Sequence, residues 1–488
     1  MKIRLITTVL LVFIIGTVFV SCADTTTDST NTSNVSGSDT KPADTDLSPF
    51  SPVDLGGRDI NILCRAPYSG YLNPYREINI EEMSSIAIEA TVYKRNQIIE
   101  NKYNCNIVGI EVEAQSQILT MVQNDIDSGA HEYDYIMPNI LIGIKLATSG
   151  YLYDLADVPN IDLSKPWWMG NIIEATSIQN INYFCPNDAN IAAMNTVGIT
   201  HFNKKLAQDY GINPNDLYKL VENGKWTLDK MKEYASNVYE DLNGNNKYDD
   251  ADVYGLGINS YTWQPFFYGS GSLLIQKDDS DIPVLKATEE NNLNILTRIV
   301  ELANQSSYVY YIPSGNHIQK FSQNQILFWV EAIYGVPTLR EMEADFGILP
   351  MPKYQEEQDG YYSTIHVNHS STTAVPLGQD NDLETIGMII EDMACYSYQH
   401  IRPTFFDNML GGQLVRDEES TKMLDFVYEN VVIDLALVFS SSITIDSIMR
   451  NALTNNSNTF ASTFAKNENV YKTAINNIVD SFNNNKSK

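Results

Sequence analysis

The chain has 488 residues, with 61 acidic and 32 basic side chains and a formal net charge of −29. This acidity makes nucleic acids and anionic lipid surfaces poor partners. Hydrophobic residues make up 43% of the chain, as in ordinary globular proteins, and the length exceeds what one core normally serves, so we expect two lobes.

The N-terminus has the pattern of a secretory signal. Lys2 and Arg4 precede an apolar run over residues 5–20, which is shorter than the roughly 20 residues of a spanning helix. Its end, Phe19-Val20-Ser21-Cys22, resembles a bacterial lipobox with Phe19 in place of the usual Leu. The resemblance implies that residues 1–21 are a signal peptide and that Cys22 is lipidated. The alternative is an ordinary cleaved signal.

Residues 22–52 follow as a polar spacer. Thr, Ser, Asp and Asn dominate it, and Phe50 is its one aromatic residue. Such a segment buries too little apolar surface to offset its chain entropy, so it predicts a disordered linker. With a lipidated Cys22, the linker would tether the folded body to the extracellular face of the cell membrane.

The body opens with alternating strand and helix patterns. Strands are predicted at 59–64, 107–112 and 133–137, and two amphipathic helices between them carry Ile88 to Tyr103 and Ile118 to Ile126. Gly129 is a plausible C-cap of the second helix. This alternation predicts a parallel α/β sheet. Because ligands bind beyond the carboxyl ends of such strands, the loops that carry Tyr68 and Asn139 are candidate binding loops.

Four cysteines remain after Cys22: Cys64, Cys105, Cys185 and Cys395. Cys64 ends one predicted strand and Cys105 precedes the next. If these strands are parallel neighbours, the two sulfurs lie at opposite ends and are too far apart to bridge. We therefore predict free, mostly buried thiols, although four cysteines allow three connectivities.

An acidic loop over residues 241–252 is the sharpest chemical motif. Oxygen-bearing side chains occupy loop positions 1, 3, 5, 9 and 12, and position 7 can ligate through its main-chain carbonyl. The pattern resembles an EF-hand or dockerin loop, with Asn246 in place of Gly at position 6 and Asp in place of Glu at position 12. It predicts a structural Ca²⁺ site; the alternative is a plain polar turn. The candidate ligands are Asp241, Asn243, Asn245, Lys247, Asp249 and Asp252.

Signatures of catalysis are missing from the sequence. His131-Glu132 lacks the second histidine of a zinc helix, and His366 and His369 stand in a context typical of a strand or loop rather than a metal-binding helix. There is no Gly-x-Ser-x-Gly elbow, phosphate loop or Cys-x-x-Cys pair. We therefore expect no enzyme and no catalytic cofactor, although a glycosidase carboxylate pair cannot be recognised from sequence alone.

Several segments together resemble the extracellular solute-binding proteins of bacterial carbohydrate ABC transporters, of the maltose-binding type (family 1). They run in order from about Asp59 to Asp446. The matching segments are Lys165-Pro-Trp167-Trp168, Phe202-Asn203-Lys204-Lys205, Tyr210-Gly211, Gly224-Lys-Trp226-Thr227, Tyr254-Gly255-Leu256, residues 321–329, Leu339-Arg340, residues 345–353, residues 403–407 and Arg416-Asp417.

The resemblance implies a two-lobe periplasmic-binding-protein-like fold of type II. Each lobe would hold a mainly parallel sheet flanked by helices, with a hinge between the lobes. The first lobe would take residues 57–187 plus 325–373, and the second residues 188–324 plus 374–480. The chain would cross near residues 186–189, return near Gln325 and cross again near residues 373–376.

The candidate ligand-binding residues follow from strand ends, from the implied hinge and from aromatic loops. Aromatic rings stack on sugar faces, whereas carboxylates, amides and Arg bind the hydroxyl groups. Trp263 belongs to an aromatic run over residues 261–268, and Trp329 and Glu331 follow the implied return strand. The set is Tyr68, Asn139, Trp167, Asp188, Trp263, Trp329, Glu331 and Arg402.

The resemblance thus implies a lipid-anchored, monomeric receptor that binds a sugar or oligosaccharide and delivers it to permease subunits. One alternative keeps the fold but binds a peptide or a polyamine, which the acidity favours weakly. Another is a cell-surface glycan-binding protein or glycoside hydrolase outside transport.

Overall fold

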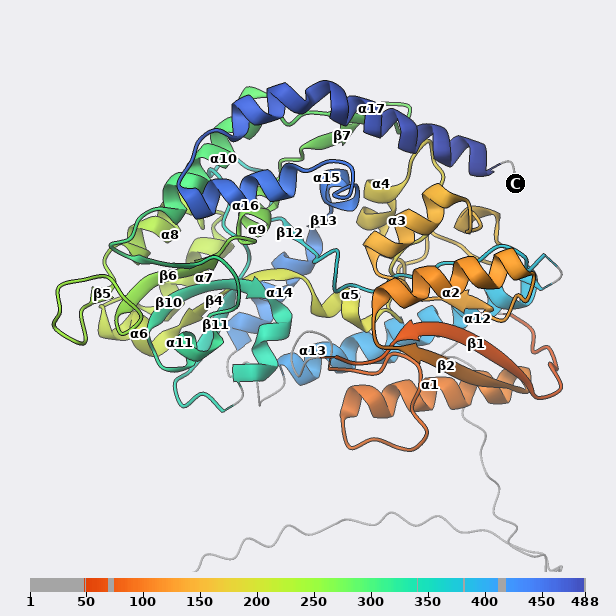
Figure 1. Ribbon diagram of the computed structural model, residues 1–488. Coiled ribbons are helices and arrows are strands. Elements are labelled where there is room, and N and C mark those ends of the chain that lie inside the picture. The colour runs from red at the N-terminus through yellow and green to blue at the C-terminus, as the bar shows by residue number, and fades with distance from the viewer. Residues whose placement is uncertain are drawn as a thin grey trace, which may run out of the picture. The chain divides into compact units, whose positions relative to one another are not determined.

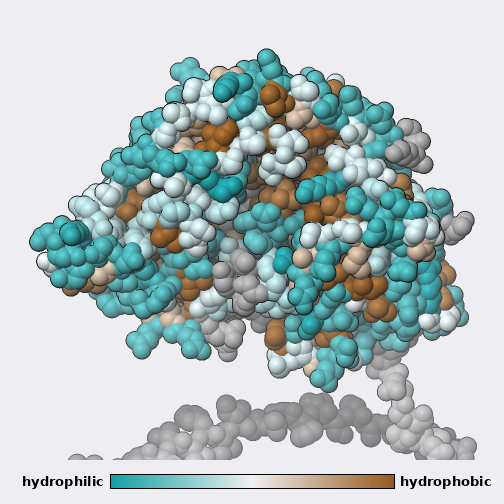
Figure 2. All heavy atoms as spheres, viewed as in Figure 1, coloured by the Kyte–Doolittle hydropathy of each residue, from teal (hydrophilic) through white to brown (hydrophobic). Residues whose placement is uncertain are grey.

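The computed structural model describes residues 48, 50–68, 74–339, 341–380, 382–410 and 418–486. Within this part, two main sheets and their helices form two α/β lobes (Figure 1). Hydrophilic side chains cover most of the face shown in Figure 2, as the composition leads one to expect. The signal peptide, Cys22 and nearly all of the linker lie outside the described residues, so those predictions stay predictions.

The first lobe contains a three-stranded parallel sheet in the order β2-β1-β3. Its strands are β1 (Arg58–Arg65), β2 (Cys105–Val112) and β3 (Tyr135–Ile136). Helices α1 (Ala87–Tyr103) and α2 (Gln115–Ser128) connect them, and Gly129 closes α2 at a φ of 70°. The predicted alternation of strands and helices is confirmed.

Strand β1 is buried on both faces, as expected in a parallel sheet covered by helices. Ile60 and Ile62 share a core cluster with Ile386 of α12 (Leu383–Tyr396). Leu63 points the other way and lies in the cluster that contains Ile118 of α2. The first lobe is therefore completed by a helix from late in the chain.

The second lobe contains a six-stranded sheet. Its strands are β4 (Gly198–Asn203), β5 (Tyr239–Glu240), β6 (Val253–Asn259), β9 (Val309–Ile312), β10 (Ile326–Ala332) and β11 (Phe346–Leu349). The order is β11-β4-β10-β6-β5, with β9 also paired to β6. β6, β9, β10 and β11 share one direction, and β4 and β5 run against them.

Helices cover both sheets, and two short strand pairs complete the fold. The strand pairs are β7 (Ile275–Lys277) with β8 (Pro283–Leu285) and β12 (Ser363–Thr364) with β13 (Val431–Val432). The other α-helices are α3 (Ile140–Ser149), α4 (Gly170–Thr176), α5 (Ile191–Asn195), α6 (Lys204–Asp209), α7 (Pro214–Glu222), α8 (Leu228–Ala235), α9 (Trp263–Gly269), α10 (Glu290–Ala303), α11 (Ile318–Ser322), α13 (Arg402–Leu410), α14 (Glu418–Glu429), α15 (Leu435–Val438), α16 (Ile445–Asn455) and α17 (Phe460–Lys486). Short 3₁₀ helices span Leu155–Asp157 and Ile333–Leu339, and a π-helix spans Ser397–Ile401.

Two segments run side by side between the sheets. Antiparallel bridges join Cys185 to Thr373 and Val197 to Ile365. Ala374 also pairs with Ile136 of β3, whereas Gly198 begins β4. The chain therefore crosses from the first lobe to the second between Cys185 and Val197, close to the predicted residues 186–189, and crosses back between Ile365 and Thr373. The predicted crossing from the first lobe to the second near residues 373–376 is wrong, because Ala374 already pairs with β3 of the first lobe.

The predicted return to the first lobe near Gln325 is wrong. β10 pairs with β4 and β6, so residues 326–332 lie at the centre of the second sheet. Conversely, α12 packs on the first sheet, although residues 374–480 were assigned to the second lobe. A continuous apolar strand has the same sequence pattern whichever sheet it joins, so the pattern could not decide its lobe.

The four described cysteines are free and buried, as predicted. In the register of the first sheet, Arg58 pairs with Cys105 and Cys64 pairs with Glu111. Cys64 and Cys105 therefore lie at opposite ends of neighbouring strands, which is the reason given for excluding their disulfide.

Candidate functional site

A cavity of about 320 Å³ lies at one edge of the second sheet. β6, β9 and β10 run parallel and end there, so the cavity is lined by Asn259, by residues 314–316 and by residues 330–332. β4 runs the other way and contributes its first residue, Gly198. Ligands of α/β proteins bind beyond the carboxyl ends of the strands, so this cavity is the candidate site.

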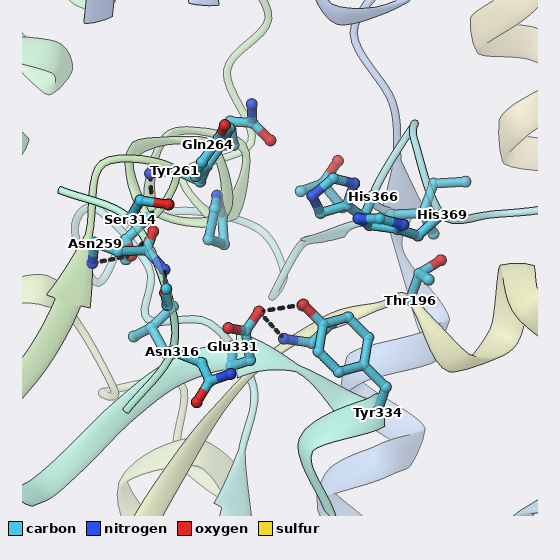
Figure 3. Close-up of a pocket in the computed structure, with 18 residues that line it drawn as sticks. Thr196, Asn259, Tyr261, Gln264, Ser314, Asn316, Glu331, Tyr334, His366 and His369 are labelled. Carbon is cyan, nitrogen blue, oxygen red and sulfur yellow. Dashed lines mark hydrogen bonds between the residues drawn. The ribbon is translucent and has the colours of Figure 1, made fainter. Parts of the chain in front are cut away.

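The other walls come from the start of α9 and from the second crossing segment. Figure 3 shows His366 and His369 lying across the cavity from Asn259 and Ser314. Among the described lining residues, Glu331 is the one carboxylate, and none is Lys or Arg. The full lining is Thr196, Gly198, Asn259, Tyr261, Thr262, Gln264, Pro265, Ser314, Gly315, Asn316, Val330, Glu331, Ala332, Tyr334, Thr364, Ile365, His366 and His369.

Glu331 is held in place by one of its two carboxylate oxygens. Its Oε1 accepts hydrogen bonds from the Tyr334 hydroxyl at 2.7 Å and from the Ala332 N–H at 3.1 Å (Figure 3). Burial raises the pKa of this carboxyl group. Its Oε2 accepts no hydrogen bond from a described residue and remains available to a donor in the cavity.

The first lobe reaches this cavity through Tyr68, which follows β1. The Tyr68 hydroxyl is hydrogen-bonded to Nδ1 of His369, and the Arg65 guanidinium carbon lies 3.4 Å from the centre of the Tyr68 ring. Tyr68 does not itself line the cavity and meets it only through His369, so its role in ligand binding stays a prediction. Arg65, which the sequence reasoning missed, makes no hydrogen bond with a described residue and brings a positive charge near this wall.

His366 and His369 are neighbours, with ring centres 4.4 Å apart. Burial lowers the pKa of His366 to about 4 and that of His369 to about 3, so both imidazoles are neutral near pH 7. Among the described residues, no three His, Cys, Asp or Glu side chains come together as a metal site. The two histidines therefore act as uncharged hydrogen-bonding groups.

Three predicted residues line a second, smaller cavity of about 160 Å³: Trp167, Asp188 and Arg402. The Trp167 indole N–H donates to Glu391 at 2.8 Å. Arg402 Nη1 lies 3.5 Å from Asp188 Oδ1, and the guanidinium also faces the Phe406 ring. Burial, partly offset by Arg402, raises the pKa of Asp188 to about 7.

Three other predicted residues line neither cavity and have structural contacts instead: Asn139, Trp263 and Trp329. Asn139 caps α3: its side-chain oxygen accepts from Ile142 N–H at 2.8 Å, and its amide donates to the Asn368 carbonyl. Trp263 and Trp329 are fully buried, and Trp329 stacks on His201. Assigning both tryptophans to ligand stacking was wrong, because their rings pack in the core: Trp329 also contacts Phe321, and Trp263 contacts Phe267 and Tyr268.

Sequence reasoning missed most of the cavity lining. Asn259 directly ends the apolar strand β6, and Ser314 follows β9, so both obey the strand-end rule that identified Tyr68. That rule was applied only to the first sheet. His366 and His369 carried no local signal, because the crossing segment brings them to the site.

The acidic loop lies between β5 and β6, away from both cavities. Asp252 directly precedes β6, whereas the cavity residue Asn259 ends the same strand. The two sites are thus separated by the length of the strand.

No protein-family model matches the chain, and no curated protein matches it by sequence. Solved structures do match. The cyclic α-maltosyl-1,6-maltose binding protein of Arthrobacter globiformis aligns with a TM-score of 0.56 at 14% identity, over 89% of this chain and 100% of that one. UgpB of Mycobacterium tuberculosis, in complex with glycerophosphocholine, aligns with a TM-score of 0.56 at 13% identity, over 87% of this chain and 99% of that one. The GacH receptor of Streptomyces glaucescens, solved unliganded and with acarbose, aligns with a TM-score of 0.51 at 14% identity, over 88% of this chain and 99% of that one.

These alignments cover nearly the whole of each solved chain, so they concern the two-lobe architecture and not one lobe. They confirm the fold class expected from the sequence, a two-lobe α/β fold of the type II periplasmic-binding-protein kind. At this identity they show the fold alone. The compounds for which these proteins are named, or with which they were solved, also differ in chemistry, so the fold does not identify the ligand.

In the described part of the chain, no helix combines the length and the apolar character needed to span a membrane.

Proposed function

We propose that this chain is the substrate-binding component of an ABC importer and that it binds a sugar or a short oligosaccharide in the 320 Å³ cavity. The observation that carries the proposal is the cavity itself. It lies at the carboxyl ends of three parallel strands, and it is lined by amide, hydroxyl and imidazole groups, in a chain with the solute-binding-protein fold.

The chemistry of the lining favours a neutral, hydroxyl-rich ligand. Asn259, Gln264 and Asn316 offer both donors and acceptors, and the carboxylate of Glu331 offers a strong acceptor for hydroxyl groups. The described lining offers no Lys or Arg to pair with an anion. The volume is near the lower end of the range for small-molecule sites, about 300–1,000 Å³, which favours a mono- or short oligosaccharide.

Of the predicted binding residues, we retain Glu331 and Tyr68 at this cavity and treat Trp167, Asp188 and Arg402 as candidates at the smaller one. The chain would do no chemistry and act as a monomer. Cys22 would carry the lipid anchor, and permease subunits would receive the ligand. The lipobox-like segment before Cys22, with Phe19 in place of Leu, and the polar linker support the anchor. The fold supports the transport role.

A thermal-shift screen of the purified protein tests this function. The panel should hold neutral mono- and oligosaccharides, uronic acids, amino sugars, peptides and polyamines. A ligand that binds only the folded state at 100 times its Kd stabilises it by about 2.7 kcal/mol. We expect a shift with one class of neutral saccharide and no released product. A shift with peptides or polyamines alone would overturn the sugar assignment, and turnover of a glycan would make the protein a hydrolase.

Glu331→Gln tests the site. Replacing a charged acceptor by a neutral one should weaken saccharide binding by about 1.5–3 kcal/mol, roughly 10- to 100-fold in Kd by calorimetry. The matched control is Glu356→Gln, because Glu356 is exposed and lines neither cavity. Equal affinity of both variants for the saccharide would remove Glu331 from the binding site.

A further inference from the structure

The loop over residues 241–252 joins β5 to β6 and is exposed along most of its length. The Asp241 carboxylate organises it by accepting hydrogen bonds from the N–H groups of Gly244 at 2.7 Å and Asn246 at 2.7 Å. Asn246 occupies the position of the EF-hand glycine and has a φ of 57°. The backbone thus makes the sharp turn that such a loop requires, with Asn in the place of Gly.

Three side chains of the loop converge on one another. The carboxamide nitrogen of Asn243 lies 3.2 Å from both oxygens of Asp249, and that of Asn245 lies 2.6 Å from Asp249 Oδ2. A half-turn of each terminal carboxamide would present its oxygen in the same direction, at the cost of the hydrogen bonds that these oxygens accept from Asn245 N–H at 3.0 Å and Lys247 N–H at 2.7 Å. The two amides and the carboxylate can therefore direct oxygens at one point.

Asp252 supplies an independent observation, because it is fully buried. Its Oδ2 accepts from Asp249 N–H at 3.1 Å and from the Tyr239 hydroxyl at 3.0 Å, and that hydroxyl also lies 3.3 Å from the Lys247 carbonyl. The carboxylate therefore faces the loop beside Asp249 and the Lys247 carbonyl. Its Oδ1 is buried and has no hydrogen-bond partner among the described residues. A buried carboxylate oxygen without a partner is costly unless a cation or a donor satisfies it.

The nearest described cation does not supply this partner. Lys320 Nζ donates to the main-chain carbonyl of Asp250 and lies 3.4 Å from that of Asp252, so it serves the backbone rather than the buried carboxylate. Lys247, within the loop, has an exposed side chain. Lys320 therefore acts on Asp249 and Asp252 only from a distance, and no described Lys or Arg forms a direct ion pair with the carboxylates of Asp241, Asp249 or Asp252.

We propose that this loop binds Ca²⁺. The ligands would be the carboxylates of Asp241, Asp249 and Asp252, the carboxamide oxygens of Asn243 and Asn245, and the main-chain carbonyl of Lys247. These groups offer at least six oxygens, which suits the flexible coordination of Ca²⁺ by six to eight oxygens at one site. The three carboxylates do not converge on their own in this structure, and the amide and carbonyl oxygens complete the set.

The ion would lock the β5–β6 connection. β5 pairs antiparallel with the first residues of β6, and Asp252 directly precedes that strand. β6 in turn forms the sheet with β10 and β9. Ca²⁺ therefore stabilises the second lobe from the end of β6 opposite the cavity, and the saccharide does not contact it.

Calcium binding is tested on the chelator-treated protein with the metal alone. We expect CaCl₂ to raise the Tm, excess chelator to reverse the rise, and Mg²⁺ at equal concentration to have little effect, because Mg²⁺ demands a near-octahedral site. Tb³⁺ reports binding directly, since Tyr239 and Tyr248 adjoin the loop and can sensitise its emission. No Ca²⁺-dependent change in Tm and no sensitised Tb³⁺ emission would overturn the proposal.

Asp249→Asn and Asp279→Asn are a matched pair for the site. Both remove one negative charge, but Asp249 is half-buried within the loop, whereas Asp279 is exposed and lies outside it. Asp249→Asn should weaken Ca²⁺ binding at least 10-fold in a calorimetric titration, whereas Asp279→Asn should leave it unchanged. Equal losses in both variants would mean general charge attraction instead of a site. The Tb³⁺ titration keeps the result readable if Asp249→Asn also lowers the Tm in chelator.

Discussion

At the scale of single residues, Asp188 should make the stability of the protein depend on pH. The side chain is buried, and burial raises its pKa to about 7. Between about pH 4 and pH 7, the folded state therefore keeps a proton that an unfolded Asp releases. Such a group removes stability as pH rises through this window, by about 1.4 kcal/mol per pH unit at most.

Asp188→Asn should abolish this contribution to the pH dependence of the free energy of unfolding. Urea unfolding at pH 5 and pH 8 should show a larger gain in the free energy of unfolding at pH 8 than at pH 5, relative to the wild type. Asp157→Asn is the control, because Asp157 is exposed. An Asp188→Asn effect of equal size at both pH values would contradict the assignment of a raised pKa.

Single residues were also where prediction from sequence was weakest. Glu331 and Trp329 are two positions apart on β10, so they share a face by strand geometry, yet Glu331 ends at the cavity and Trp329 is covered by His201 and Phe321. The difference comes from position along the strand, not from the side it faces. Sequence pattern gives the face of a residue but does not give what packs on it.

At the scale of elements, Glu77 ties the two crossing segments together. Its Oε1 accepts from Ala192 N–H in α5 at 2.8 Å and from the Ser371 hydroxyl at 2.7 Å. The side chain is buried, and burial raises its pKa. One carboxylate oxygen from the first lobe thus binds donors on both crossing segments.

Glu77→Ala should lower the free energy of unfolding by about 2–4 kcal/mol, because it leaves two buried donors without an acceptor. Glu77→Gln keeps an acceptor oxygen and should lose less. Glu81→Ala changes an exposed residue nearby and controls for charge. Urea titrations of the three variants measure the difference. If Glu77→Gln loses as much as Glu77→Ala, the charge matters and not the hydrogen bonds.

The elements of the first lobe were predictable, and the connectivity of the second was not. β1, β2 and their helices alternate within about 70 residues of chain, so local periodicity carries most of the information. In the second sheet, β4 lies between β10 and β11, more than 120 positions later in the sequence. Pairing over such separations is decided by packing, which leaves no local pattern.

At the scale of the whole molecule, α17 packs against elements of both lobes. Phe482 is buried against Tyr183, whose hydroxyl donates to the Phe482 carbonyl at 3.0 Å. Asn485 donates to the Ala147 carbonyl in α3, and the helix also packs against α16 and β8 (Figure 1). The last helix of the chain therefore contributes to stability beyond its own length.

Phe482→Ala should lower the free energy of unfolding by about 3 kcal/mol, as expected for loss of a buried aromatic side chain. Val470→Ala is the matched control, because Val470 is 60% exposed on the same helix. Thermal and urea unfolding measure both. A loss below about 0.5 kcal/mol for Phe482→Ala would mean that the end of α17 frays and fastens nothing.

The placement of α12 on the first sheet has a consequence for how fast the chain can fold. Asp392 of α12 accepts from Ser48 N–H at 2.9 Å across 344 positions of sequence, and from the Tyr103 hydroxyl at 2.6 Å across 289. The first lobe, though begun by the earliest strands, cannot close its core until most of the polypeptide has been synthesised. Contacts between residues far apart in sequence slow folding. We therefore expect the first lobe to complete its folding only after the chain of the second lobe has been made. Ribosome-bound chains that stop before α12 should leave β1 and β2 open to proteases.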